Sequence, residues 1–98
     1  MKDILANLNK AFENRIRLGI MSVLMVNEWM EFNTLKELLE TTDGNLASHL
    51  KALEEKAYIK TKKQFVGRKP NTSYQATESG KTLFKIHLDA LEELIKSQ

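Results

Sequence analysis

The sequence contains no cysteine, and this absence removes several kinds of chemistry. Disulfide bonds, thiolate nucleophiles and thiolate metal sites are all excluded, and the composition suits a reducing compartment. Proline occurs once and glycine four times, which is too little of either for a disordered or low-complexity chain. We therefore expect a folded cytoplasmic protein.

Long apolar runs are also missing. The first residues, Met1 to Asn7, lack the apolar stretch of a signal peptide. No segment approaches the roughly 20 apolar residues of a membrane-spanning helix. The 98 residues suffice for one domain with a modest core, so we expect a single domain over residues 1–98. Such a small body would gain stability from a further buried surface, such as a dimer interface.

The net charge is small, but it is unevenly distributed. Between Lys56 and Thr77 there is no acidic residue, whereas six are basic. These six are Lys56, Lys60, Lys62, Lys63, Arg68 and Lys69. The rest of the chain carries nine basic and thirteen acidic residues, a net charge of −4. A basic patch on an acidic body is typical of a surface that binds a polyanion in one orientation.

Apolar residues recur at helical spacing in the first quarter of the chain. They run from residue 4 to 12 and from 16 to 26, with Asn14 between the two segments. The pattern predicts either one long helix or a short arm before a longer helix. The second segment is apolar on nearly all sides and is expected to be the central core helix. Gly19 within it indicates a close crossing with another helix.

Two helices are predicted after a short linker at residues 28–32, which could supply a stub of strand. Thr34 is expected to cap the first helix, with Glu37 completing a capping box. The second helix is predicted over residues 42–56 with Thr42 as its N-cap. Almost nothing joins the two helices, which is the helix-turn-helix arrangement.

The helix at 42–56 is expected to have one apolar and one small, polar face. Leu46, Leu50 and Leu53 fall within a narrow arc and should point inward. The opposite side then consists of Gly44, Ala47, Ser48 and Lys51, with Asn45 and His49 at its flanks. Small residues allow the backbone to approach another surface closely.

The segment from Tyr58 to Ala76 is predicted to be a β-ribbon. Alternation predicts a strand to Val66 with Ile59, Thr61, Lys63 and Phe65 on one side and Lys60, Lys62 and Gln64 on the other. Residues 67–71 have turn chemistry, and 72–76 form the returning strand. Thr77 should cap a last helix whose apolar stripe is too broad for one small body to cover. A narrow helix followed by a cationic ribbon suits a duplex groove and its phosphates.

These segments match a known pattern. The run Leu-Ala-Ser-His-Leu-Lys-Ala-Leu-Glu-Glu at 46–55, followed by Tyr58 and Ile59, resembles the recognition helix of winged-helix transcriptional regulators of the MarR and ArsR type. The tip Gly-Arg-Lys-Pro at 67–70, with 72–74 and 77–80, is similar to their wing and next helix start. The likeness extends from about Arg15 to the C-terminus and is greatest to small members without a sensor domain.

The resemblance implies a mainly α fold with a small β-ribbon, a winged helix-turn-helix with N- and C-terminal dimerisation helices. It implies a homodimer that binds double-stranded DNA through the recognition helix (42–56) and a basic wing (58–76). The implied groove contacts are Asn45, Ser48, His49 and Lys51. The implied wing contacts are Lys62, Lys63, Arg68 and Lys69.

The chain departs from the family pattern at two points. Ala57 stands where the family usually has glycine, and a left-handed residue there would cost alanine about 1 kcal/mol, so we expect a tighter or differently wound exit. The metal sites of ArsR-type proteins do not carry over, because only His87, Asp89, Glu92 and Glu93 are available, at the wrong spacings. We expect no cofactor and no metal, and no small-molecule effector can be named.

Several alternatives remain at this stage. The lysines of the ribbon could form a solvated edge that discourages aggregation, and His49 could pack against the neighbouring helix. His87 is expected at a dimer interface, where the apolar surfaces of the two end helices would cross. The chain could also be a winged-helix protein-interaction module that does not read DNA sequence. We expect no enzymatic activity, because no catalytic set or phosphate loop can be assembled.

Overall fold

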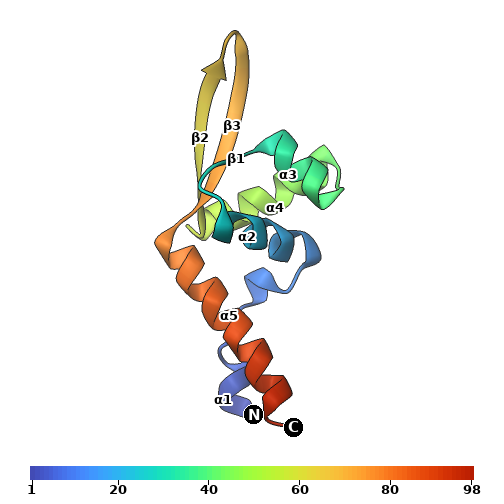
Figure 1. Cartoon of the computed structure of the whole chain (residues 1–98), viewed down its shortest axis with the longest axis vertical. Coiled ribbons are helices and arrows are strands. Elements are labelled where there is room, and N and C mark those ends of the chain that lie inside the picture. Colours follow the sequence, from blue (N-terminus) through green and yellow to red (C-terminus); the bar gives the residue numbers. More distant parts are fainter.

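The computed structural model describes residues 1–98 and has an elongated shape. Its principal extents are 55 × 25 × 21 Å, and its Cα radius of gyration is 14.8 Å. A compact domain of this length would have about 13 Å. The difference arises because a two-stranded ribbon projects from one end of the helical body and a long helix extends from the other (Figure 1).

The chain forms helices and one small sheet. The helices are α1 (Lys2–Leu5), the 3-10 turn η1 (Lys10–Phe12), α2 (Arg15–Val26), α3 (Phe32–Leu39), α4 (Asp43–Glu55) and α5 (Glu78–Lys96). The strands are β1 (Met30–Glu31), β2 (Ile59–Val66) and β3 (Lys69–Ala76), and they pair antiparallel in the order β1-β3-β2. The predicted fold class, mainly α with a small β-ribbon in a winged helix-turn-helix, is confirmed.

The N-terminal segment is an arm and not a long helix. The side chain of Asn14 accepts hydrogen bonds from the backbone N–H groups of Ile16 and Arg17, so it caps α2 and separates it from the arm. The arm itself lies along α5, and α1 reaches the C-terminal end of that helix (Figure 1). Of the two predicted arrangements, the short arm is the one observed.

The core forms around α2 and one aromatic ring. Phe12 is buried, with its ring centroid 5.1 Å from that of Phe84, 5.4 Å from Tyr58 and 5.5 Å from His87. Gly19 marks a close helix crossing as expected, because a Cβ there would lie 2.6 Å from Leu39 Cδ2 of α3. The same buried cluster includes residues of α2 and β2, so it holds the arm, α2, β2 and α5 together.

Two of the three predicted helix caps are confirmed. The hydroxyl of Thr42 accepts from the N–H of Asn45 at 3.2 Å, and that of Thr77 accepts from Gly80 at 3.0 Å. The capping box at Thr34 is wrong, because α3 already begins at Phe32. Glu31 pairs with Ser73 in the sheet, so the chain passes directly from β1 into the helix.

The ribbon is longer than predicted. Its turn consists of Gly67, with φ +67°, and Arg68 alone, because Val66 already pairs with Lys69. The prediction of a turn over residues 67–71 is wrong, since Pro70 pairs with Phe65 within the ladder. The strands consequently stay paired up to the tip.

The exit from α4 keeps the left-handed conformation despite the missing glycine. Ala57 has φ +60°, and the N–H of Tyr58 donates to the carbonyl of Leu53 at 3.0 Å. The expectation of a tighter or differently wound exit is therefore wrong. The Ala57 carbonyl accepts a hydrogen bond from the Thr77 hydroxyl at 2.7 Å, which holds the strained residue in place.

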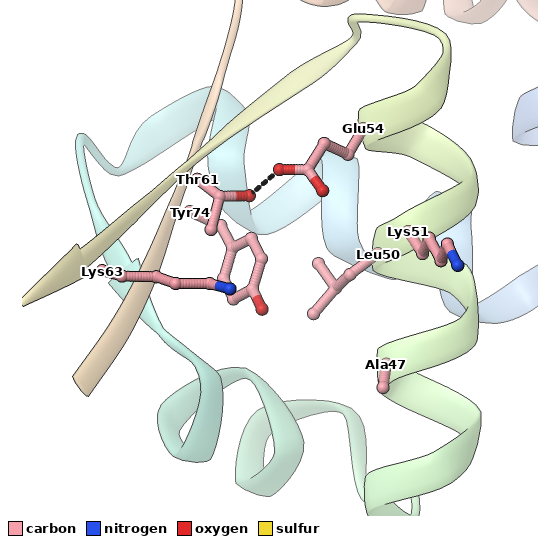
Figure 2. Close-up of a pocket in the computed structure, with 7 residues that line it drawn as sticks. All are labelled: Ala47, Leu50, Lys51, Glu54, Thr61, Lys63 and Tyr74. Carbon is pink, nitrogen blue, oxygen red and sulfur yellow. Dashed lines mark hydrogen bonds between the residues drawn. The ribbon is translucent and has the colours of Figure 1, made fainter. Parts of the chain in front are cut away.

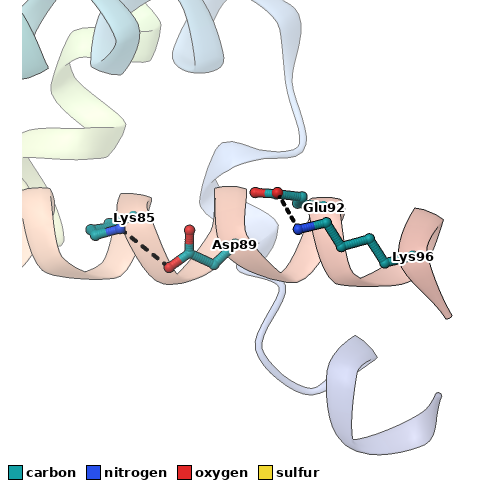
Figure 3. A network of polar contacts seen from close by, with 4 residues as sticks. All are labelled: Lys85, Asp89, Glu92 and Lys96. Atoms are coloured by element: carbon teal, nitrogen blue, oxygen red, sulfur yellow. Dashed lines mark hydrogen bonds and ion pairs between the residues drawn. The ribbon is translucent and has the colours of Figure 1, made fainter.

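His87 lies inside the single chain and not on its outer surface. It is 3 % exposed, and its Nδ1 accepts a hydrogen bond from the backbone N–H of Asn9 at 3.0 Å. The expectation that His87 lies at a dimer interface is wrong, because the N-terminal arm covers it. Outside this contact, α5 carries ion pairs between Lys85 and Asp89 and between Lys96 and Glu92 (Figure 3).

None of the helices combines the length and the apolar character that crossing a membrane would require.

Candidate nucleic-acid interface

The two faces of α4 are those predicted from the sequence. Leu46, Leu50 and Leu53 are buried against the body. Gly44, Ala47, Ser48 and Lys51 are all exposed. Asn45 is exposed as well, and its side-chain amide donates to the hydroxyl of Thr41 at 3.0 Å. The exposed side is narrow and polar, with no bulky side chain before Lys51, so another surface can approach its backbone.

His49 differs from its neighbours because it is only half-exposed. Burial, followed by the nearby charge of Arg17 on α2, lowers the pKa of His49 below its usual value. The imidazole is therefore neutral at pH 7. The Nε of Arg17 is itself buried without a hydrogen-bond partner. His49 lies on the α2 side of α4, and its packing role is the better supported of the two alternatives.

The ribbon has two faces of different composition. On one face Thr61, Lys63 and Phe65 stand opposite Tyr74, Thr72 and Pro70. On the other face the lysines approach Trp29, with Lys62 Nζ 4.4 Å and Lys60 Nζ 5.9 Å from the ring centroid. A cation over an indole face is attracted by the ring electrons. Lys62 and Lys63 therefore lie on opposite faces of the ribbon, as the alternation predicted. The sequence did not show which residues each face contacts.

A cleft of about 370 Å³ lies between α4 and the ribbon (Figure 2). It is lined by Ala47, Leu50, Lys51, Glu54, Thr61, Lys63 and Tyr74. Lys51 of the helix and Lys63 of the ribbon therefore border the same opening. Both predicted site residues line the cleft, together with the carboxylate of Glu54. The amine of Lys63 reaches into the cleft, whereas the amine of Lys51 points to the outer side of α4 (Figure 2).

One polar bond across the cleft was missed by the sequence reasoning. The hydroxyl of Thr61 donates to the carboxylate of Glu54 and ties the base of β2 to the end of α4 (Figure 2). Burial, and then the charge of Glu54, raises the pKa of Tyr74. Alternation placed Thr61 on one face of the ribbon, but no local signal shows which helical residue it meets.

Arg68 and Lys69 lie at the far end of the ribbon and are exposed. They do not line the cleft. The tip that carries them projects well beyond the helical body (Figure 1). No acidic residue lies between Lys56 and Thr77, so no carboxylate of the ribbon itself interrupts its basic residues between the cleft and the tip.

Comparisons with known proteins identify a family and several similar proteins. The model of the winged helix DNA-binding domain matches residues 16–95. An uncharacterized protein of Methanocaldococcus jannaschii is 39 % identical over 88 residues, which are 90 % of this chain and 96 % of that protein. The structure of a transcriptional regulator homologue from Pyrococcus horikoshii OT3 has a TM-score of 0.86 at 32 % identity, covering 98 % of this chain and 93 % of the other.

A more distant structure has the same fold. HlyU from Vibrio cholerae superimposes with a TM-score of 0.64 at 21 % identity, over 87 % of this chain and 88 % of that protein.

Proposed function

The chain belongs to the family of winged helix DNA-binding domains, and from this premise we propose that it is a homodimeric transcriptional regulator of the MarR/ArsR-like group that binds double-stranded DNA. The observation that carries the proposal is the cleft where the exposed side of α4 adjoins Lys63 of the ribbon. A helix and a cationic ribbon on one surface can straddle the sugar–phosphate backbone between two grooves. A transcriptional regulator homologue of similar structure supports this assignment.

The recognition helix, residues 42–56, is proposed to enter the major groove. That groove is about 12 Å wide and admits an α-helix. Asn45 and Ser48 are exposed and short, and their side chains can donate and accept hydrogen bonds at base edges. Lys51, at the rim of the cleft, suits a guanine edge or a phosphate. His49 would contribute at the flank only, because it is half-buried and neutral.

The wing, residues 58–76, is proposed to contact phosphates. Lys63 shares the cleft with α4 and is the nearest wing cation to the groove that the helix would occupy. Lys62 approaches from the other face, where Trp29 restrains its position. Arg68 and Lys69 at the tip extend the contact along the backbone. Each cation that neutralises a phosphate releases counterions, so binding should weaken with salt.

The experiment is a fluorescence anisotropy titration of labelled duplex DNA over a range of salt concentrations. Replacing Lys63, Arg68 or Lys69 by alanine should weaken binding to all sequences alike and flatten the salt slope by about one unit per lost contact. Changing Asn45 or Ser48 should instead alter sequence preference in a selection from a random duplex pool. Lys96→Ala is the matched control, because it removes the same charge from α5, where Lys96 pairs with Glu92.

The proposal fails if the wing variants and the control have the same affinity and salt slope as the unmodified protein. A second candidate function is a protein-interaction module, which the exposed apolar side chains of Phe65 and Val66 at the wing tip would favour. That role predicts weak duplex binding even at low salt. The same titration therefore separates the two functions.

A further inference from the structure

The wing tip carries an aromatic side chain that the monomer leaves in solvent. Phe65 is 74 % exposed and the adjacent Val66 is 58 % exposed. Each of the other six aromatic residues of the chain is buried or half-buried. Pro70, which pairs with Phe65 across the ribbon, is exposed as well. Because exposing an aromatic ring to water is unfavourable, this apolar pair at the end of a projecting ribbon is a candidate binding surface.

The register of the ribbon gives the direction of this ring. Phe65 stands opposite Pro70, on the same strand face as Thr61 and Lys63. Thr61 and Lys63 line the cleft beside α4. The Phe65–Pro70 pair therefore continues the ribbon face that adjoins the recognition helix, whereas Val66 and Lys69 belong to the opposite face.

The distance along the ribbon fits the spacing of DNA grooves. Phe65 lies four residues beyond Thr61, roughly 13 Å at ~3.3 Å per residue. Half a turn of B-DNA, which separates a major groove from the next minor groove, is about 17 Å. A ribbon that starts at the cleft beside α4 thus ends near the neighbouring minor groove.

The tip is also built to keep its shape. The strands remain paired to Val66 and Lys69, and the turn between them has only two residues. Pro70 has a fixed φ and needs no hydrogen-bond partner for its missing N–H. The surrounding cations, Lys63, Arg68 and Lys69, and the absence of acids between Lys56 and Thr77 favour a polyanion as the occupant.

We propose that the Phe65–Pro70 pair is a wedge that enters the minor groove beside the major groove occupied by α4, opens one base step and bends the duplex. This inference rests on the proposed DNA-binding function. Apolar side chains inserted between base steps kink the duplex toward the major groove. Pyrimidine–purine steps open most easily, so the wedge gives sequence preference without a hydrogen bond to a base.

The test uses a duplex that the unmodified protein selects from a random pool, with a donor and an acceptor dye at the two ends of the duplex. The unmodified protein should bring the ends closer, and 2-aminopurine placed at the wing-side step should brighten as it unstacks. Replacing that step by an A-tract should weaken binding about tenfold. In Phe65→Ala both optical changes should disappear, and the two duplexes should bind equally well.

Val66→Ala is the matched control, because it shortens an exposed apolar side chain on the opposite face, and it should bend DNA as the unmodified protein does. Binding by the unmodified protein without bending overturns the wedge and leaves the proposed function standing. Failure to bind any duplex at low salt overturns both. If Phe65→Ala bends DNA normally but changes the sedimentation of the free protein, the tip joins two copies and the wedge is wrong.

Discussion

At the scale of single residues, Ala57 shows how a tertiary contact can stabilise an unfavourable conformation. Its φ of +60° places the Cβ too close to its own carbonyl oxygen. The conformation persists because the Ala57 carbonyl accepts from Thr77 at 2.7 Å and the Tyr58 N–H donates to Leu53 at 3.0 Å. The first bond joins the exit of α4 to the start of α5, and the second closes the end of α4, so together they fix where the wing begins.

Ala57→Gly should therefore raise the free energy of unfolding by about 1 kcal/mol, because glycine adopts this conformation without steric strain. Urea denaturation followed by circular dichroism measures the change. Ala47→Gly is the control, since Ala47 lies within α4 in an ordinary helical conformation and glycine there should cost about 1 kcal/mol. Equal effects of the two substitutions would show that Ala57 is not strained.

His87 should make stability depend on pH. Burial lowers its pKa below the ordinary value, and the charge of Glu13 raises it by less. Its Nδ1 accepts from Asn9, which requires the neutral ring. At pH values between the folded-state pKa of His87 and about 6.5, the unfolded chain binds more protons than the folded chain. The free energy of unfolding therefore falls as the pH drops through this range, and it falls no further below the folded-state pKa.

In His87→Gln this part of the pH dependence should be absent, whatever the variant does to stability at pH 8. Urea midpoints measured from pH 8 to pH 5 give the slopes. The pKa of His49 is lowered as well, so His49→Gln should reduce the dependence of the urea midpoint on pH by a separate amount. A His87→Gln protein whose slope equals that of the unmodified chain would contradict the assignment of a neutral buried imidazole.

At the scale of elements, the bond between Thr61 and Glu54 ties the wing to the recognition helix. Thr61→Val removes the hydroxyl at nearly constant volume. The hydrogen bond holds the angle between β2 and α4, and such a bond contributes about 1 kcal/mol. Its loss should therefore weaken DNA binding about fivefold. The change in affinity is measured by anisotropy titration. Thr72→Val is the control, because Thr72 lies on the same ribbon face opposite Lys63, away from Glu54. Equal affinities for the two variants would mean that the bond does not position the wing.

Elements whose signals are local could be predicted from the sequence. The inward face of α4 follows from the spacing of Leu46, Leu50 and Leu53, and the cap at Thr42 needs only the next turn of helix. The cap at Thr34 was mispredicted because pairing of Glu31 with Ser73, far along the chain, sets where α3 begins. Strand and helix compete for the same residues there, and no short-range pattern decides between them.

Within the candidate site too, local features could be predicted from the sequence and long-range contacts could not. Exposure of Ser48 and Lys51 could be predicted, since it follows from the helical period alone. The partner of Lys62 could not, because Trp29 reaches the ribbon only through the sheet formed by β1 and β3. His87 could not be placed either, since its hydrogen-bond partner Asn9 lies 78 residues away. The spacing of apolar residues carries no information about contacts between residues so far apart in the sequence.

At the scale of the whole molecule, α5 keeps an apolar stripe that the single chain covers only in part. Leu88 is 41 % exposed, Leu91 40 % and Ile95 76 %. Steps of three and four residues place them on one side of the helix. A second copy that crosses α5 about a two-fold axis would cover the same residues on both chains. The two recognition helices would then reach half-sites about 34–36 Å apart.

Leu91→Glu should prevent this association, because it would bury an unpaired charge in each half of the interface. We expect the variant to remain folded and to sediment as a monomer, since Leu91 is not part of the monomer core. Its affinity for a duplex with two half-sites should fall about 100-fold as the second contact ceases to be intramolecular. Its affinity for a single half-site should not change.

Thr82→Glu is the control, because it introduces the same charge on the opposite, exposed side of α5. It should leave both the sedimentation and the DNA affinity unaltered. An unmodified chain that sediments as a monomer while binding two half-sites cooperatively would show that the DNA, and not α5, brings the subunits together.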